Sequence, residues 1–187
     1  MKSNYTEKAK AALLLAEKAA KKFHQSYVGT EHILIGLLQE NTAIASRVLQ
    51  DNGVDYQKVK EMIQDLIAPT SGVSVKERDG YSPKALAVLE EAQMQAERFG
   101  YEKVGTEHIL LAMIKEADNV AVRLLNTMGV SCQKIYIDIL IAMGEDGGLY
   151  KTDLSKNKGN GKQKSILEQY SRNLTAFAKK GKIDPVV

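Results

Sequence analysis

Small and apolar side chains recur every three to four residues near the start of the chain, a spacing that places them on one face of an α-helix. Thr6 is a suitable N-cap for this helix, and Glu7 stands in its first turn, where the helix dipole favours a carboxylate. Segment 82–99 repeats the pattern and opens with Ser82 followed by proline, a cap and a favoured first helical residue. Within residues 6–23 the repeating positions are Ala9, Ala12, Leu13, Ala16, Ala20 and Phe23.

Three further helices are predicted after each of these two. The second begins at a Gly-Thr-Glu-His motif, with Thr30 and Thr106 as its expected N-caps in the two halves. The third covers about 42–52 and ends at an Asn-Gly pair, a common helix stop. The fourth covers about 55–67, and its counterpart 131–143. No segment alternates as a β-strand does, so an all-α protein with eight helices is expected.

The two halves are copies of one unit. An offset of 76 residues aligns Tyr5–Ala68 with Tyr81–Gly144 without a gap, and 24 of the 64 paired positions are identical. The motif Gly29-Thr-Glu-His32 recurs as Gly105-Thr-Glu-His108. We therefore expect two four-helix repeats, related by a pseudo-twofold axis, that form one compact domain.

Composition divides the chain into five segments. The repeats are predicted at 1–68 and 81–144, joined by a linker, 69–80, that is rich in turn residues. Segment 145–165 is polar, glycine-rich and basic, which is typical of a flexible tether. Segment 166–187 regains helical periodicity and is predicted to form a short helical tail.

Charge and cysteine content exclude several classes of protein. The net charge of +3 comes from residues 145–187, which hold nine Lys or Arg against five Asp or Glu, whereas the other 144 residues hold 17 against 18. The folded body therefore lacks the basic surface of a nucleic-acid-binding protein. No apolar run approaches the roughly 18 residues of a membrane span. The single cysteine, Cys132, and the polar N-terminus predict a cytoplasmic protein without disulfides.

The motif repeats a glutamate, Glu31 and Glu107, at the first turn of a helix. The structural interpretation is that Thr-Glu is a good helix start and that His32 and His108 each satisfy a nearby carbonyl group. The motif glycine is then expected to adopt a turn geometry. The functional alternative is that the repeated carboxylates bind a ligand.

The motif and the chain end resemble one family. Val-Gly-Thr-Glu-His-Ile-Leu in both halves is similar to the N-terminal double-repeat domain of Clp-type AAA+ unfoldases, most closely the ClpC branch. Residues 167–186 are similar to the segment that leads into the first ATPase module of these proteins. The resemblance covers nearly all of 5–187, which we interpret as an N-terminal piece that ends before the ATPase.

The resemblance implies a ligand. ClpC-type N-domains bind phosphoarginine on substrates marked for degradation, which assigns Glu31 and Glu107 as acceptors of the guanidinium group, in one pocket per repeat. Thr6 and Ser82 are then candidates for the phosphate side, since a helix N-terminus binds anions. Tyr5 and Tyr81 are either hydrophobic staples or part of a groove for adaptors and peptides.

Catalysis is not expected in this chain. No Gly-x-x-x-x-Gly-Lys-Ser/Thr loop is present, so ATP and magnesium belong to the absent ATPase modules and no cofactor is expected here. No catalytic residue is assigned, and His24, His32 and His108 do not have the spacing of a metal site. The implied partners are substrate proteins, adaptor proteins and, for the whole protein, a ClpP-type protease, with this piece monomeric. The alternative is a stand-alone regulatory or scaffold protein.

Overall fold

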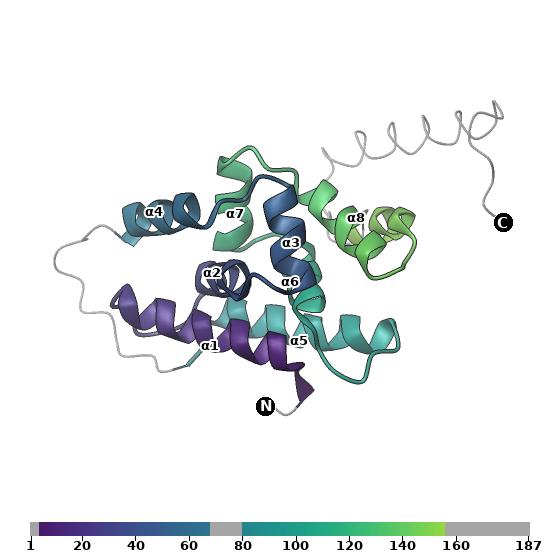
Figure 1. Ribbon diagram of the computed structural model, residues 1–187, viewed down its shortest axis with the longest axis horizontal. Coiled ribbons are helices and arrows are strands. Elements are labelled where there is room, and N and C mark those ends of the chain that lie inside the picture. The colour runs from purple at the N-terminus through teal and green to yellow at the C-terminus, as the bar shows by residue number, and fades with distance from the viewer. Residues whose placement is uncertain (1–3, 68–79, 156–187) are drawn as a thin grey trace. The chain divides into compact units, whose positions relative to one another are not determined.

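The computed structural model describes residues 4–67 and 80–155, in which α-helices are the only extended regular elements. Figure 1 shows their arrangement. The all-α prediction is confirmed, and eight helices fall into two sets of four at the predicted places. The helices of the described residues are α1 (Glu7–Lys22), α2 (Thr30–Glu40), α3 (Ile44–Asp51), α4 (Tyr56–Ile67), α5 (Pro83–Arg98), α6 (Thr106–Lys115), α7 (Val120–Thr127), α8 (Cys132–Ala142) and α9 (Tyr150–Ser155).

The chain separates into two compact units, Met1–Gly147 and Gly148–Val187. The first unit contains both sets of four helices. The second begins with α9, a short helix inside the stretch that the sequence predicts to be a flexible tether. The predicted tail, 166–187, and nearly all of the predicted linker, 69–80, lie outside the described residues, and the boundaries drawn from sequence remain predictions.

The first helices of the two repeats begin as predicted. Thr6 Oγ1 accepts a hydrogen bond from the backbone N–H of Ala9 at 3.2 Å, and Ser82 Oγ accepts one from Ala85 at 3.1 Å. Both caps have an extended backbone, and the proline after Ser82 occupies the first turn of α5. Each helix therefore starts with an N-cap whose hydroxyl oxygen accepts a backbone hydrogen bond, at equivalent positions of the two repeats.

The small residues of α1 serve close packing between helices. Gly36 on α2 faces the backbone of α1 at Ala12 and Ala16, and a Cβ added there would overlap the Ala12 carbonyl oxygen. Ala12 and Ala16 are themselves fully buried. Because neither helix carries a bulky side chain at this point, α1 and α2 approach closely along their length.

The two repeats are interleaved rather than placed end to end. The segment before α1 pairs with the segment before α6, since the N–H of Thr6 donates to the carbonyl of Val104 at 2.9 Å. In the same way the N–H of Ser82 donates to the carbonyl of Val28, just before α2, also at 2.9 Å. Helix α2 thus contacts α5 and α7, and α6 contacts α1 and α3. In Figure 1, α1 and α5 lie on one side of α2 and α6, and α3 and α7 lie on the other.

The fourth helices differ in how firmly they pack. Helix α8 buries four side chains, including those of Tyr136 and Leu140, and contacts α3, α6 and α7. The positions in register with these two residues on α4 are Lys60 and Gln64, so α4 lacks half of that apolar face. Leu66 at the end of α4 remains 64% exposed. The two halves share a fold but not the same surface.

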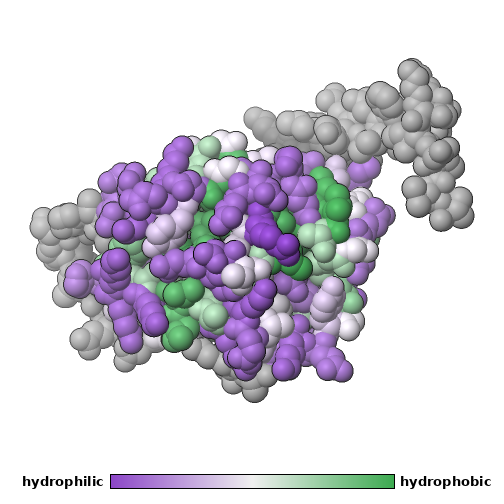
Figure 2. Space-filling view, in the orientation of Figure 1, coloured by the Kyte–Doolittle hydropathy of each residue, from purple (hydrophilic) through white to green (hydrophobic). Residues whose placement is uncertain are grey.

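The visible surface is mostly polar. Figure 2 shows hydrophilic side chains over most of the face in view, with apolar side chains in small separate patches. None of the described helices is both long enough and apolar enough to span a bilayer.

Candidate functional site

The repeated motif builds the same helix start in both halves. The N-caps are Gly29 and Gly105, one residue before the predicted Thr30 and Thr106, so that prediction was wrong. Thr30 instead accepts a hydrogen bond from the backbone N–H of Ala121 at 3.2 Å and helps to cap α7 of the other repeat. Thr30, which the sequence predicts to cap its own helix, therefore links the two repeats.

The motif histidines complete this helix start. The N–H of Gly29 donates to Nδ1 of His32 at 2.9 Å, and the N–H of Gly105 donates to Nδ1 of His108 at 2.8 Å. Each histidine thus accepts from the N-cap residue, the reverse of the predicted bond to a carbonyl. Both side chains are fully buried. Burial lowers the pKa of His32 to about 4 and also lowers that of His108, so both imidazoles are neutral at pH 7.

The other imidazole nitrogen is buried in both histidines. Because Nδ1 accepts, the proton resides on Nε2, and neither Nε2 has a hydrogen-bond partner within the described residues. Tyr101 meets His108 edge-on, with ring centroids 4.7 Å apart, and Phe23 lies 6.0 Å from His32. These histidines orient the motif and are shielded from any ligand in solvent.

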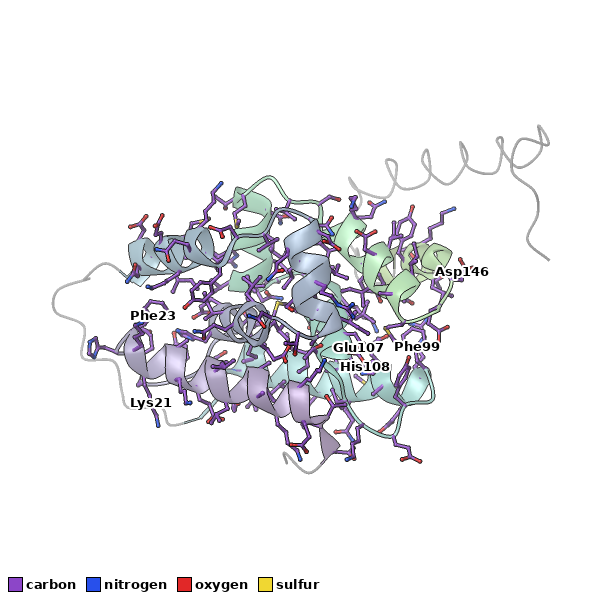
Figure 3. The ribbon with its side chains drawn as sticks, viewed as in Figure 1. Lys21, Phe23, Phe99, Glu107, His108 and Asp146 are labelled. Carbon is purple, nitrogen blue, oxygen red and sulfur yellow. The ribbon has the colours of Figure 1, made fainter. Side chains whose placement is uncertain are left out.

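The motif glutamates fold back over the motif glycines. Each glutamate side chain is 14% exposed. A Cβ built on Gly29 or Gly105 would collide with the carboxylate oxygens of Glu31 or Glu107. The backbone φ of these glycines, −91° and −95°, is open to any residue, so the predicted turn geometry was the wrong reason for glycine. Glycine is required because the carboxylate occupies the space of its side chain. Figure 3 shows Glu107 beside His108 at the start of α6.

Neither glutamate has a cationic partner among the described residues. Glu31 Oε1 lies 3.5 Å from His32 Nδ1, and the corresponding distance at Glu107 is 3.8 Å, but a neutral imidazole that already accepts a hydrogen bond cannot pair with a carboxylate. Burial raises the pKa of Glu31 above its usual range. A mostly buried carboxylate without a counter-ion is costly to maintain, which is typical of a binding site.

Glu31 opens into a small polar cavity that both repeats build. The cavity has a volume of about 220 Å³. Ser82, the N-cap of α5, lines it together with Glu31 from α2, so the two predicted site residues meet although they belong to different repeats. Its lining residues are Tyr27, Gly29, Thr30, Glu31, Ser82, Lys84, Asp118, Asn119, Val120 and Arg123.

Residues in register with those around Glu31 also lie near the start of α6, which carries Glu107. The hydrogen bond from Thr6 to Val104 holds the N-cap of α1 beside the start of α6. Lys8 in the first turn of α1 donates to the carbonyl of Thr42, just before α3, at 3.0 Å. By register, Glu107 with Thr6 corresponds to Glu31 with Ser82, and the hydrogen bond to Val104 brings this cap of one repeat to the motif of the other.

A larger apolar cavity adjoins the Glu31 site. Its volume is about 780 Å³, and it shares Tyr27, Glu31, Val120 and Arg123 with the polar cavity. Sequence reasoning missed it, although Lys60 and Gln64 in place of large apolar residues signal that α4 packs loosely. The remaining lining residues are Gln25, Met62, Ile63, Asp65, Leu66, Leu124 and Thr127.

The tyrosines and the cysteine considered from sequence lie apart from these cavities. Tyr5 is buried, and Tyr81 donates its hydroxyl hydrogen to Glu17 Oε1 at 2.9 Å; neither tyrosine lines either cavity. Arg123, which lines both cavities, pairs with Asp118 at 3.1 Å. Burial raises the pKa of the Cys132 thiol to about 11, so it is not a reactive thiolate.

Comparison with known proteins points to the same family that the repeated motif resembles. The chain matches the Clp repeat (R) N-terminal domain over residues 4–128 and 80–164, two overlapping stretches. It is 36% identical to the chaperone protein ClpB of Oceanobacillus iheyensis and 36% identical to the negative regulator of genetic competence ClpC/MecB of Bacillus subtilis. Both alignments cover 100% of this chain but only 23% and 22% of the two relatives, so the chain spans less than a quarter of their length.

Solved structures show the same fold. The N-terminal domain of ClpD from Arabidopsis thaliana superposes with a TM-score of 0.66 at 22% identity, covering 76% of this chain and 99% of that one. A ClpV N-domain in complex with a VipB peptide superposes with a TM-score of 0.58 at 22% identity, covering 75% and 86%. The duplicated motif, the helical fold and these matches together show that the chain belongs to the Clp repeat N-terminal domain family.

Proposed function

We propose that this chain is the substrate- and adaptor-recognition domain of a Clp-type unfoldase and that it binds phosphoarginine through Glu31 and Glu107. One observation carries the proposal. Both glutamates are 14% exposed, lack a cationic partner among the described residues and lie over a glycine whose missing side chain makes room for the carboxylate. Such a site is prepared for a cation that arrives from outside.

The guanidinium group fits these carboxylates. It is planar and presents paired N–H donors, which a carboxylate can accept in a two-pronged hydrogen bond. It also carries charge in a form that is less strongly hydrated than an ammonium group, so it enters a mostly buried site at a lower desolvation cost. The partly buried carboxylate of Glu31 therefore favours an arginine side chain over a lysine side chain.

The phosphoryl group would meet the opposite wall of the cavity. Ser82 at the start of α5 contributes a hydroxyl group and a helix N-terminus, and Lys84 and Arg123 contribute positive charge. Thr6 and Lys8 occupy the corresponding positions near Glu107. A ligand with a cationic and an anionic end separated by one bond matches this arrangement better than either ion alone.

Calorimetric titration with free phosphoarginine tests the assignment. We expect two bound molecules per chain and no binding by the E31A/E107A double variant. The matched control is E90A, which removes an exposed glutamate from the middle of α5 that lines neither cavity. Arginine and inorganic phosphate are titrated separately and should bind at least tenfold more weakly. Undiminished binding by the double variant would disprove the role of the glutamates.

A second candidate function is recognition of unmodified peptide segments. The apolar cavity of about 780 Å³ beside Glu31 and the exposed Leu66 favour it. In this case an adaptor or substrate would place apolar side chains between α4 and α7. Binding of an unmodified apolar peptide that L66D abolishes and E31A leaves intact would support this candidate.

The role of the whole protein follows from the relatives as a proposal. We place it in the cytoplasm as an AAA+ unfoldase that delivers recognised substrates to a ClpP-type protease, and we propose that the present chain is monomeric and needs no cofactor. The alternative of a stand-alone regulatory protein predicts that no ATPase module follows in the gene, which sequencing the locus would decide.

A further inference from the structure

The two glutamate sites differ in the charges that surround their phosphate side. Near Glu31, Lys84 Nζ lies 3.0 Å from one oxygen of Asp118, and Arg123 lies 3.1 Å from the other. Hydrogen bonds from Lys84 and Arg123 lower the pKa of Asp118, so its carboxylate is charged at neutral pH. One acid therefore partly neutralises both basic side chains that line the cavity.

The site near Glu107 has no acid at the position that Asp118 occupies near Glu31. The residue in register with Asp118 is Thr42, and Lys8 donates to its backbone carbonyl at 3.0 Å instead of to a carboxylate. Arg47, in register with Arg123, forms no ion pair with any described residue. Glu40 is the acid nearest to Thr42, and its carboxylate accepts hydrogen bonds from the N–H groups of Thr42 and of the α3 N-cap, Ala43.

A further lysine adds to the difference. Lys103 is in register with Tyr27, which lines the polar cavity at Glu31. Lys103 lies close enough to Glu7 to contribute to the lowered pKa of that carboxyl group, for which Lys10 is the main cause. Glu7, in register with Pro83, is an acid at this site, but its charge is offset by Lys10 at 2.9 Å and by Lys103.

We infer that the two sites are unequal: the site at Glu107 binds the doubly charged phosphoryl group more tightly than the site at Glu31, because Asp118 opposes an anion only at the latter. The inference rests on the proposed function. On the cation side both glutamates have the same exposure and the same contact with a glycine, and the one difference among the described residues is a long hydrogen bond, 3.4 Å, from Thr106 Oγ1 to Glu107. Because the charged groups are exposed, we expect about a three- to tenfold difference in dissociation constant at low salt, which shrinks as salt is added.

Single-site variants isolate each site. E31A leaves only the Glu107 site and E107A leaves only the Glu31 site, and each is titrated with free phosphoarginine at low and high ionic strength. We expect the tighter dissociation constant in E31A. Equal constants at low salt would overturn the inference alone, whereas absence of binding in both variants would overturn the proposed function and the inference together.

Exchanging the two register residues tests the cause. D118T in the E107A background should tighten binding by about three- to tenfold, and T42D in the E31A background should weaken it by a similar factor. D118N serves as a second variant that removes the charge and keeps the shape, and thermal melts confirm that each variant is folded. Unchanged affinity in both D118T and D118N would assign the difference to something other than Asp118 and disprove the inference.

Discussion

The carboxylate of Glu31 lies over the α-carbon of Gly29, in the space where any other residue would carry its Cβ. Glu107 and Gly105 repeat this relationship in the second half of the chain. The glycine backbone is extended and would tolerate a side chain, so only the carboxylate explains the glycine. The position of each glutamate thus depends on the space over its glycine, and Glu107 also accepts a hydrogen bond from Thr106 Oγ1 at 3.4 Å.

Replacing the glycine should separate binding from stability. In G29A the new methyl group collides with the end of a flexible side chain, which can rotate away, so we expect the melting temperature to change by no more than a few degrees. The displaced carboxylate should weaken phosphoarginine binding at the Glu31 site at least tenfold. Calorimetry in the E107A background measures it. A variant that binds normally would show that the position of the carboxylate does not matter.

Removing the charge of Glu31 should not harm the fold. Burial raises the folded-state pKa above the unfolded value, so the stability that this group contributes is present below the unfolded pKa and is lost as the pH rises through the folded pKa. At pH 7 the buried carboxylate therefore destabilises the protein. We expect E31Q to have an equal or higher melting temperature than the parent at pH 7 and no advantage near pH 4, while ligand binding is lost.

The control for that variant is E90Q, which changes an exposed glutamate on α5. Its melting temperature should follow the parent at both pH values. A clear fall in the melting temperature of E31Q at pH 7 would contradict the interpretation, because it would mean that the carboxylate has a stabilising partner.

The buried histidines should make the domain sensitive to acid. The folded-state pKa of His32 is about 4 against a usual value of 6.5, so the unfolded chain binds the proton first as the pH falls. The contribution of neutral His32 to the free energy of unfolding is fully present above pH 6.5. It should decline towards pH 4 by up to about 1.4 kcal/mol per pH unit. Urea unfolding at pH 7.5, 6 and 5 measures the slope.

NMR titration identifies the histidine responsible. The imidazole of His32 should keep its proton on Nε2 and remain neutral down to about pH 4–5. H24Q, which replaces an exposed histidine after α1, is the control and should leave the slope of stability against pH unchanged. An imidazole of His32 that titrates near 6.5 would refute the proposed tautomer and its role in the helix start.

The close approach of α1 and α2 depends on one missing side chain. In G36A the added methyl group meets the backbone of α1 at Ala12 and Ala16, which cannot move without shifting the helix. Overpacking of this kind costs about 1–3 kcal/mol, measured by urea unfolding. The matched variant is A112G at the position in register on α6, which creates no clash and should cost about 0.5–1 kcal/mol. Equal stability of G36A and the parent would show that the two helices can separate freely.

The eight helices could be predicted because their signals are local. The 3.6-residue spacing of Ala9, Leu13 and Ala16 and the side-chain caps Thr6 and Ser82 depend on residues within one or two turns of each other. The motif was also identifiable, since its duplication is visible without a structure. Its details were not: Gly29 rather than Thr30 is the N-cap, its N–H donates to a buried histidine three residues later, and the Thr30 hydroxyl accepts from Ala121 of the other repeat.

By itself the sequence determined that this protein is a duplicated helical domain with one glutamate at the same place in each copy. Only the tertiary structure decided that Glu31 and Ser82 of the other repeat line one cavity and that Asp118 pairs with both basic residues of that cavity. The reason is physical. Helix periodicity and capping depend on residues that are close in sequence. They would be the same whether each motif packed against a helix of its own repeat or against a helix of the other repeat. The choice depends on contacts between distant segments, such as the hydrogen bonds from Thr6 to Val104 and from Ser82 to Val28.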